Sequence, residues 1–268
     1  MKKWTLIGLL MCAFAIAKAQ DPMSVLKSIP IEANNLQVDD LGNAYVLRKD
    51  NALIKFNEFG DSMANYISIA NGDIAVVDVT NPLRVMLYYA EFSKLVLLDR
   101  MLAPKNELNL RKLNQLNSNV IATSAEGNLW VYDQFNATLS KLDMELNVMI
   151  QGNDLRQQLS ELPKPSYLIE RDRRVYMADT SLGLLIFDQY GTYLNTLSLI
   201  GLHKMQIVGS QIIYQKANQL IAYDFKKFVE TQIPIPVLAQ SAIVQAAYCR
   251  NILYVLYTDR LVLYRLRK

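Results

Sequence analysis

A short strand-and-turn pattern recurs six times along this chain and constrains its fold more than any other feature. Each copy has several apolar or aromatic residues and closes on a polar residue, usually Asp. The closing residues are Asn57, Asp99, Asp133, Asp188, Asp224 and Arg265. They are separated by 42, 34, 55, 36 and 41 residues, and a repeat of this length is typical of a solenoid or a propeller.

Further strand-like segments surround each copy. In every unit, one segment precedes the copy and is joined to it by a short polar turn, which predicts a β-hairpin. These preceding segments are 44–47, 85–89, 120–123, 175–178, 212–215 and 253–257. A more apolar segment precedes each hairpin, at 36–38, 74–77, 108–113, 167–169, 205–208 and 243–246. A fourth segment follows, at 63–69, near 101–102, and at 139–150, 193–199 and 228–235. Six units of four antiparallel strands, without helical periodicity, predict an all-β, six-bladed propeller.

The two ends of the repeat array favour closure of a ring. The sixth unit has no fourth strand, and a strand-like run at 24–32 precedes the first unit. We expect this run to complete the last blade, so that no sheet edge is left open. Pro30 fits such an outer strand, because proline has no backbone N–H to donate.

The interval of 55 residues predicts an insertion between blades 3 and 4, at 152–163. An Asn-Asp pair near its start can cap a helix, and Pro163 can end it. Its leucines have helical spacing: Leu155, Leu159 and Leu162. We therefore expect a short inserted helix.

Residues 1–19 have the features of a secretory signal. Lys2 and Lys3 precede an apolar run at 6–17, and an Ala-x-Ala cleavage signal follows at 17–19. A helix that spans a bilayer needs about 20 apolar residues, so this run is too short, and no other stretch of the sequence is apolar enough to span one. We expect export to the periplasm or the outer membrane and a single domain over 20–268. Lipidation at Cys12 stays open, although the preceding methionine is not the small residue of lipid-attachment motifs.

Cleavage of the signal also removes three lysines, leaving 25 Lys and Arg against 25 Asp and Glu. A formally neutral chain argues against nucleic acid or an anionic lipid surface as partner. Cys249 is then the remaining thiol, so an internal disulfide is excluded. We interpret Cys249 as a small buried hydrophobic residue rather than a reactive thiol.

The copies at 129–136 and 184–191 resemble the third strand and following turn of six-bladed propellers of the NHL or TolB-like kind. The segments 188–194 and 57–61 match this pattern best, and 39–46 resembles the approach to its second strand. The resemblance extends over nearly the whole mature chain. It implies blades and no activity, because the motifs are structural.

No pattern in the sequence carries catalytic chemistry. The one histidine, His203, has no tight acidic cluster beside it, so we expect a capping or solvated residue and no metal or other cofactor. Serine-hydrolase and phosphate-loop motifs are missing from the sequence. Six-bladed lactonases hold a central calcium with Glu, Asn and Asp, and such a set could still converge from different blades. We interpret Trp130 as core packing between blades and assign no catalytic residue.

Two other patterns have structural interpretations. An Asp at the start of a turn in each unit predicts side-chain acceptance of backbone N–H bonds rather than catalysis. The basic run 171–174 is typical of a solvated hairpin tip, which we favour over an anion site.

Two functional hypotheses follow. The first is a non-enzymatic binding or scaffold propeller of the bacterial cell envelope, monomeric by itself, which recognises a protein or glycan through one face. Turns between second and third strands and the insertion should share that face, and they contain the candidate contact residues Arg48, Lys49, Asp50, Glu91, Lys94, Glu126, Arg156, Gln157, Glu161, Asp179, Lys216, Asp259 and Arg260. The alternative is a lactonase, lyase or hydrolase with a central funnel, which requires convergent acids or a metal set.

Overall fold

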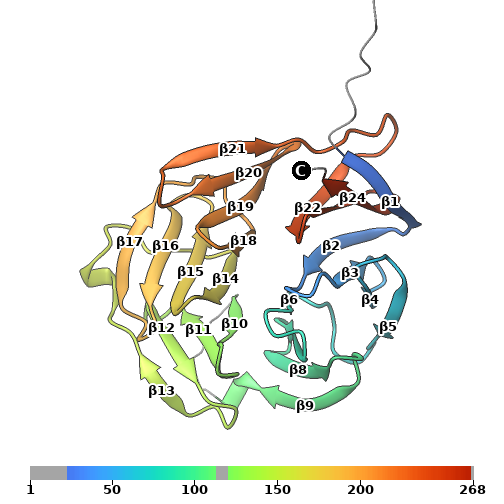
Figure 1. The fold of residues 1–268 in the computed structure, drawn as a ribbon. Helices are drawn as coiled ribbons and strands as arrows, with labels where there is room; N and C mark the ends of the chain where they lie inside the picture. Colours follow the sequence, from blue (N-terminus) through green and yellow to red (C-terminus); the bar gives the residue numbers. More distant parts are fainter. Residues whose placement is uncertain (1–22, 113–119, 267–268) are drawn as a thin grey trace, which may run out of the picture.

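The protein is a ring of six four-stranded antiparallel sheets around a central axis (Figure 1). A computed structural model describes residues 23–112 and 120–266. The predicted signal segment 1–19 and Cys12 lie outside this range. The predicted all-β propeller with six blades is confirmed.

The first three blades follow one another along the chain, and each begins with its innermost strand. Blade 1 contains β2 (Ala33–Val38), β3 (Ala44–Arg48), β4 (Leu53–Phe56) and β5 (Ser62–Tyr66). Blade 2 contains β6 (Val76–Asp78), β7 (Arg84–Tyr89), β8 (Lys94–Asp99) and β9 (Pro104–Asn109). Blade 3 contains β10 (Ile121–Thr123), β11 (Leu129–Asp133), β12 (Thr138–Leu142) and β13 (Val148–Gln151).

The last three blades complete the ring. Blade 4 contains β14 (Tyr167–Arg171), β15 (Arg174–Asp179), β16 (Gly183–Asp188) and β17 (Tyr193–Leu197). Blade 5 contains β18 (Met205–Val208), β19 (Gln211–Lys216), β20 (Gln219–Asp224) and β21 (Val229–Ile233). Blade 6 contains β22 (Ile243–Cys249), β23 (Ile252–Tyr257), β24 (Arg260–Leu266) and, as its outer strand, β1 (Met23–Pro30).

Pairing of β1 with β24 closes the ring, as the sequence predicts. The antiparallel register runs from Met23 opposite Leu266 to Pro30 opposite Arg260. Because β1 comes first among the strands and β24 last, the ring is held shut by hydrogen bonds between the two ends of the described chain.

Each of the six core clusters lies between two neighbouring blades. In β7, for example, Val85, Leu87 and Tyr89 belong to the cluster shared with blade 1, whereas Met86 and Tyr88 belong to the cluster shared with blade 3. Strands buried on both faces have continuous apolar runs rather than alternation, which is the pattern that recurs in the sequence. Trp130 is fully buried between blades 3 and 4, so its predicted packing role is confirmed.

The turns after the third strands repeat one geometry. In blades 1 to 4, the first side chain of the turn accepts the N–H groups two and four residues later; these side chains are Asn57, Asp99, Asp143 and Asp188. Asp224 in blade 5 accepts the N–H groups two and three residues later. The predicted turn role is confirmed for Asp99, Asp188 and Asp224, and also for Asp133, which accepts the N–H groups of Phe135 and Asn136.

The predicted strand assignment in blade 3 was wrong by one strand. Residues 120–123 overlap the first strand, β10, and the repeat copy ending at Asp133 is the second strand, β11. Most of 108–113 belongs to the end of β9 and to a 3-10 turn, η1 (Leu110–Lys112). The equivalent of Asp99 and Asp188 is therefore Asp143, and the intervals become 42, 44, 45, 36 and 41 residues.

The predicted insertion is less helical than expected. The connection 152–166 contains a single 3-10 turn, η2 (Leu155–Gln157), whose N-cap Asp154 accepts a 3.0 Å hydrogen bond from the Arg156 N–H. Leu155 is buried between blades 3 and 4, and Leu159 and Leu162 pack partly buried against the same cluster. The long interval that suggested the helix came largely from the shifted strand assignment.

In the part of the chain that the structure describes, no helix is long and apolar enough to cross a membrane.

Candidate functional site

The innermost strands surround two cavities that meet inside the ring. We call the face with the turns between first and second strands the turn face. We call the opposite face, with the turns between second and third strands and the connections between blades, the loop face. A cavity of about 480 Å³ lies toward the turn face and one of about 400 Å³ toward the loop face. Gln37, Val38, Met205 and Gln206 line both, so the cavities meet near mid-channel.

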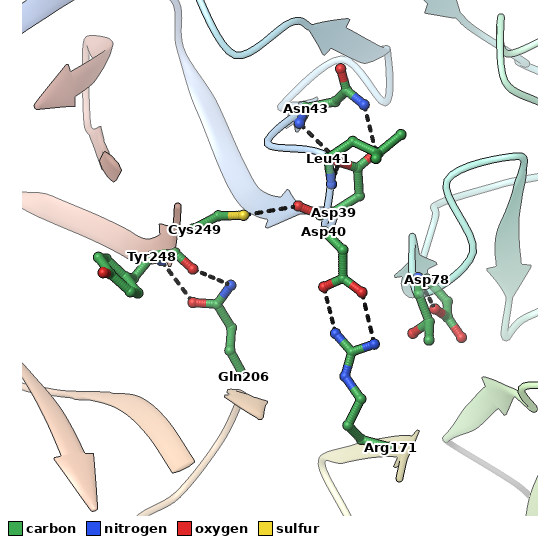
Figure 2. Close-up of polar contacts among 10 residues, drawn as sticks. Asp39, Asp40, Leu41, Asn43, Asp78, Arg171, Gln206, Tyr248 and Cys249 are labelled. Carbon is green, nitrogen blue, oxygen red and sulfur yellow. Dashed lines mark hydrogen bonds and ion pairs between the residues drawn. The ribbon is translucent and has the colours of Figure 1, made fainter. Parts of the chain in front are cut away.

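An ion pair spans the turn-face cavity (Figure 2). Arg171, at the end of β14, donates from Nη1 to Oδ2 of Asp40 at 2.8 Å and from Nη2 to Oδ1 at 2.5 Å. Asp40 follows β2 in blade 1 and Arg171 lies in blade 4, and these blades are opposite each other in a ring of six. The hydrogen bond to Asp40 raises the pKa of Arg171. The basic run is therefore not simply a solvated hairpin tip, because its first arginine reaches across the channel.

Two other carboxylates of this cavity, those of Asp39 and Asp78, hold backbone turns. Asp39 is buried and accepts the N–H groups of Leu41 and Asn43, both at 2.9 Å. Asp78 accepts the N–H of Thr80 at 2.8 Å and that of Thr123, in the next blade, at 2.6 Å. These oxygens stabilise the ring, so they are poorly placed to act as a general base.

Cys249 lines the same cavity but has the properties of a structural thiol. Its Sγ donates to the backbone oxygen of Asp39 at 3.4 Å (Figure 2). The side chain packs partly buried against the core between blades 6 and 1. Burial raises the pKa of the Cys249 thiol. Because the thiolate is the nucleophile, this shift disfavours nucleophilic chemistry near neutral pH.

The loop-face cavity has a different charge. Lys204 and the exposed His203 line it, and its described lining residues include no Asp or Glu. Burial lowers the pKa of Lys204. The exposure of His203 agrees with the predicted solvated residue. The turn-face lining instead contains four aspartates and two arginines, so the channel is acidic toward one face and basic toward the other.

Glutamine side chains fix the walls of the channel. Gln245 accepts the Leu36 N–H at 3.1 Å and donates to the Leu36 oxygen at 2.6 Å, across the boundary between blades 6 and 1. Gln206 makes the same pair of bonds with Tyr248, across the boundary between blades 5 and 6. Over the described ranges, no group of three His, Cys, Asp or Glu side chains could hold a metal ion.

The structure places most of the predicted contact residues on the loop face. Nine lie in or beside turns between second and third strands: Arg48, Lys49, Asp50, Glu91, Lys94, Asp179, Lys216, Asp259 and Arg260. Arg156, Gln157 and Glu161 lie in the connection between blades 3 and 4. Glu126 is the exception, because the shifted assignment of blade 3 puts it between β10 and β11, on the turn face.

Many of these charges already have partners. Lys49 pairs with Glu32 at 3.1 Å, and Arg48, Lys49, Asp50 and Asp259 surround a surface hollow of about 690 Å³ beside the end of β1. Asp179 is 3% exposed and its carboxylate accepts the N–H groups of Lys164, Ser181 and Leu182. Asp179 therefore stabilises its turn and offers little to a partner.

An exposed apolar patch on the loop face could not be read from the sequence. We define the blade 1–2 patch as Ile67, Ile69, Glu91, Phe92 and Arg111. Ile69 is 96% exposed, Ile67 56% and Phe92 44%. The Arg111 guanidinium lies 6.0 Å from the centre of the Phe92 ring and donates to the Glu91 backbone oxygen at 3.1 Å. Single exposed apolar residues in connections carry no periodic signal, and their clustering depends on the packing of two blades.

The patch rests on an anchored segment. Asn51, in the turn between β3 and β4, donates from Nδ2 to the Gly72 oxygen at 2.7 Å and accepts the Ile74 N–H at 2.9 Å. Gly72 packs so closely on the Phe92 ring that a Cβ atom there would lie 2.9 Å from it. Gly72 also has φ +72°, a conformation that favours glycine. These contacts hold the connection that carries Ile67 and Ile69 against the turn that carries Phe92.

Comparison with protein-family profiles and with curated protein sequences finds no match. Among solved structures, the chain is similar to a virginiamycin B lyase from Staphylococcus aureus, with 11% identity over 91% of this chain and 100% of that chain, and a TM-score of 0.62. It is also similar to the WD40 domain of Neurospora crassa Pan2, with 8% identity over 92% and 96% of the two chains and a TM-score of 0.57. A streptogramin B lyase gives 10% identity over 87% and 78%, with a TM-score of 0.54. At such low identity, these similarities establish the β-propeller fold alone.

Proposed function

We propose that this protein is a non-enzymatic binding or scaffold propeller of the bacterial cell envelope that recognises a partner protein through its loop face. The observation that carries the proposal is the blade 1–2 patch. Its apolar side chains stand in solvent beside a cation–π pair and several loop-face charges. Apolar patches rimmed by charged residues are typical of protein interaction sites.

The composition of the patch suits a binding surface. Aromatic residues and arginine are enriched at interfaces, and Phe92 and Arg111 provide both at the turn that contacts the connection carrying the isoleucines. Lys49, Asp50 and Glu91 lie at neighbouring positions of the same face and suit a polar rim. Burial of Ile69 and Phe92 by a partner would contribute a favourable hydrophobic free energy that these exposed side chains do not contribute in the free protein.

Preorganisation supports the same proposal. The Asn51 bonds to the connection and the contact of Gly72 with Phe92 keep the patch in one arrangement before any partner arrives. A surface that is already ordered loses less conformational entropy on binding.

The location in the envelope rests on the sequence. Residues 1–19 have a basic start, an apolar run and an Ala-x-Ala signal, which together favour export. The NHL or TolB-like resemblance of the repeats is compatible with an exported binding propeller that is monomeric by itself.

An enzyme with a site in the channel is the second candidate. The two meeting cavities favour it, as does the fold similarity to two lyases. Against it, the carboxylates of Asp39 and Asp78 are taken up by backbone N–H groups, and the pKa of the Cys249 thiol is raised. These three residues are therefore better suited to structure than to acid–base or nucleophilic catalysis.

The test uses two patch variants and two matched controls from the turn face. Ile69→Asp and Phe92→Ala remove apolar area from the patch. Leu83→Asp and Phe59→Ala make the same kinds of change at residues that are 66% and 62% exposed. The mature chain, with each change, is cross-linked in the envelope fraction and its partners are quantified by mass spectrometry.

We expect the patch variants to lose one partner that the wild-type chain and both controls retain. Loss of a hot-spot side chain costs about 2 kcal/mol or more, which corresponds to an affinity reduced about 30-fold. Melting temperatures of all four variants check that the ring stays folded. Undiminished recovery with the patch variants, or equal loss with the controls, would contradict the proposed function.

A further inference from the structure

The loop-face cavity contains a cation without a counter-ion. Lys204 lies in the connection before β18, is partly buried and lines the cavity of about 400 Å³. Among the described residues, neither an ion pair nor a hydrogen bond engages its Nζ. Of the lining residues that the structure describes, none is acidic and could supply a negative charge.

Other shielded lysines of this protein are satisfied. Lys55 donates to the Arg100 backbone oxygen at 2.9 Å and its Nζ lies 5.1 Å from the Tyr45 ring centre. Lys94 pairs with Glu107 at 2.6 Å, and Lys141 pairs with Glu126. Lys204 therefore differs from Lys55, Lys94 and Lys141, the other shielded lysines among the described side chains.

A poorly solvated charge is costly unless something compensates it. Burial is the cause of the lowered pKa of Lys204, so the ammonium group has lost part of its hydration and received nothing in return. A bound anion would offset the free energy that the ammonium group loses by desolvation, for as long as the anion stays bound.

The rest of the lining selects the kind of anion. Val38 and Val244 give the wall partly exposed apolar side chains, whereas Leu36 and Ile213 are buried in the cores between blades. The volume of about 400 Å³ falls in the range of small-molecule sites. One lysine supplies one positive charge, which matches a monoanion better than a dianionic phosphate.

We propose that the loop-face cavity binds a small organic carboxylate, with its charged group on Lys204 and its apolar body against Val38 and Val244. This site is separate from the blade 1–2 patch and does not depend on recognition of a partner protein.

Sodium octanoate is the probe, and 1-octanol, which has the same chain length without the charge, is its neutral control. Binding of each to the mature chain is measured by isothermal titration calorimetry. Lys204→Met removes the cation, and Lys226→Met removes an exposed lysine of the turn face as the matched variant. Lys204→Gln repeats the test with a polar replacement in case methionine disturbs folding.

We expect octanoate to bind the wild-type chain and Lys226→Met equally, and to bind both Lys204 variants at least tenfold more weakly, which corresponds to about 1.4 kcal/mol. Octanol should bind the wild-type chain and the Lys204 variants alike. Octanoate binding that ignores both Lys204 changes would overturn the proposal, as would no binding by the wild-type chain at about 1 mM.

The melting temperature without ligand gives an independent readout. If Lys204 is an uncompensated cation, Lys204→Met should melt at the same temperature as the wild-type chain or higher. A melting temperature several degrees lower would mean that the fold itself satisfies Lys204, and the proposal would then fail.

Discussion

Single side chains link neighbouring blades around the channel. Gln245 and Gln206 each bind both backbone groups of one residue on the next innermost strand. Glu170 of blade 4 accepts the indole N–H of Trp130 in blade 3. These hydrogen bonds fix the position of one blade relative to the next across boundaries that are otherwise apolar.

Tyr132 and Tyr254 provide a test of how much a buried hydroxyl contributes. The Tyr132 hydroxyl is buried without a hydrogen-bond partner in the described structure, and burial raises the pKa of Tyr132 to about 12. The Tyr254 hydroxyl donates to the Gly42 oxygen at 2.8 Å. We expect Tyr132→Phe to stabilise the protein by about 1 kcal/mol and Tyr254→Phe to destabilise it by about the same amount.

Urea unfolding of the two tyrosine variants checks this difference in sign. The pair controls for the loss of one oxygen atom in the core, because both tyrosines are buried in propeller strands. A loss of stability for Tyr132→Phe would show that its hydroxyl has a partner after all.

At this scale, local roles are predictable and distant pairings are not. The turn aspartates and the packing of Trp130 follow from residue type and neighbouring sequence. Arg171 could not be assigned in the same way, because its partner Asp40 lies 131 positions away and on the opposite blade. The role of Lys204 could not be predicted either, because it depends on the lack of an acidic residue among the described residues that line the cavity with it.

The strands and turns show why one blade was misassigned. The second and third strands of a blade are both buried on two faces, so β11 has the same apolar run as a third strand. What differs is the turn. In the turns after third strands, the fourth residue has positive φ, as at Gly60, Leu102, Leu146 and Gly191. Two of these are leucines, which removes the glycine that marks this turn in the sequence.

The connection 152–166 has a structural component that can be measured. Leu155 is 1% exposed in the core between blades 3 and 4, whereas Leu159 only packs against that core from outside. We expect Leu155→Ala to destabilise the protein by about 2–5 kcal/mol, the usual cost of a buried Leu-to-Ala change, and Leu159→Ala to cost clearly less. The midpoints of urea unfolding give both values. Equal, small effects would mean that the connection is an independent appendage.

For the whole molecule, ring closure and blade number were predictable because they follow from the count and period of the strands. The face to which Glu126 belongs was not, since it depends on one strand assignment. The polarity of the channel was not predictable either. It arises where residues from five blades meet, and no single stretch of sequence contains that information.

Closure predicts a strong effect of removing one strand. Deleting residues 23–30 should expose the hydrogen-bonding edge of β24 and cause aggregation or a large fall in melting temperature. Size-exclusion chromatography and thermal melting report the two outcomes. Deleting only 21–22, which precede β1, is the matched control. A monomeric, equally stable protein without β1 would rule out a closing role for this strand.

The pairing of β1 with β24 also orders events in time. The ribosome makes β1 before every other strand of the ring and β24 after all of them. Five blades can form from local contacts as the chain emerges, but the sixth must wait until its outermost and second-outermost strands coexist. A nascent or prematurely terminated chain therefore has unpaired strand edges that chaperones and proteases can bind. In the closed ring these edges are paired.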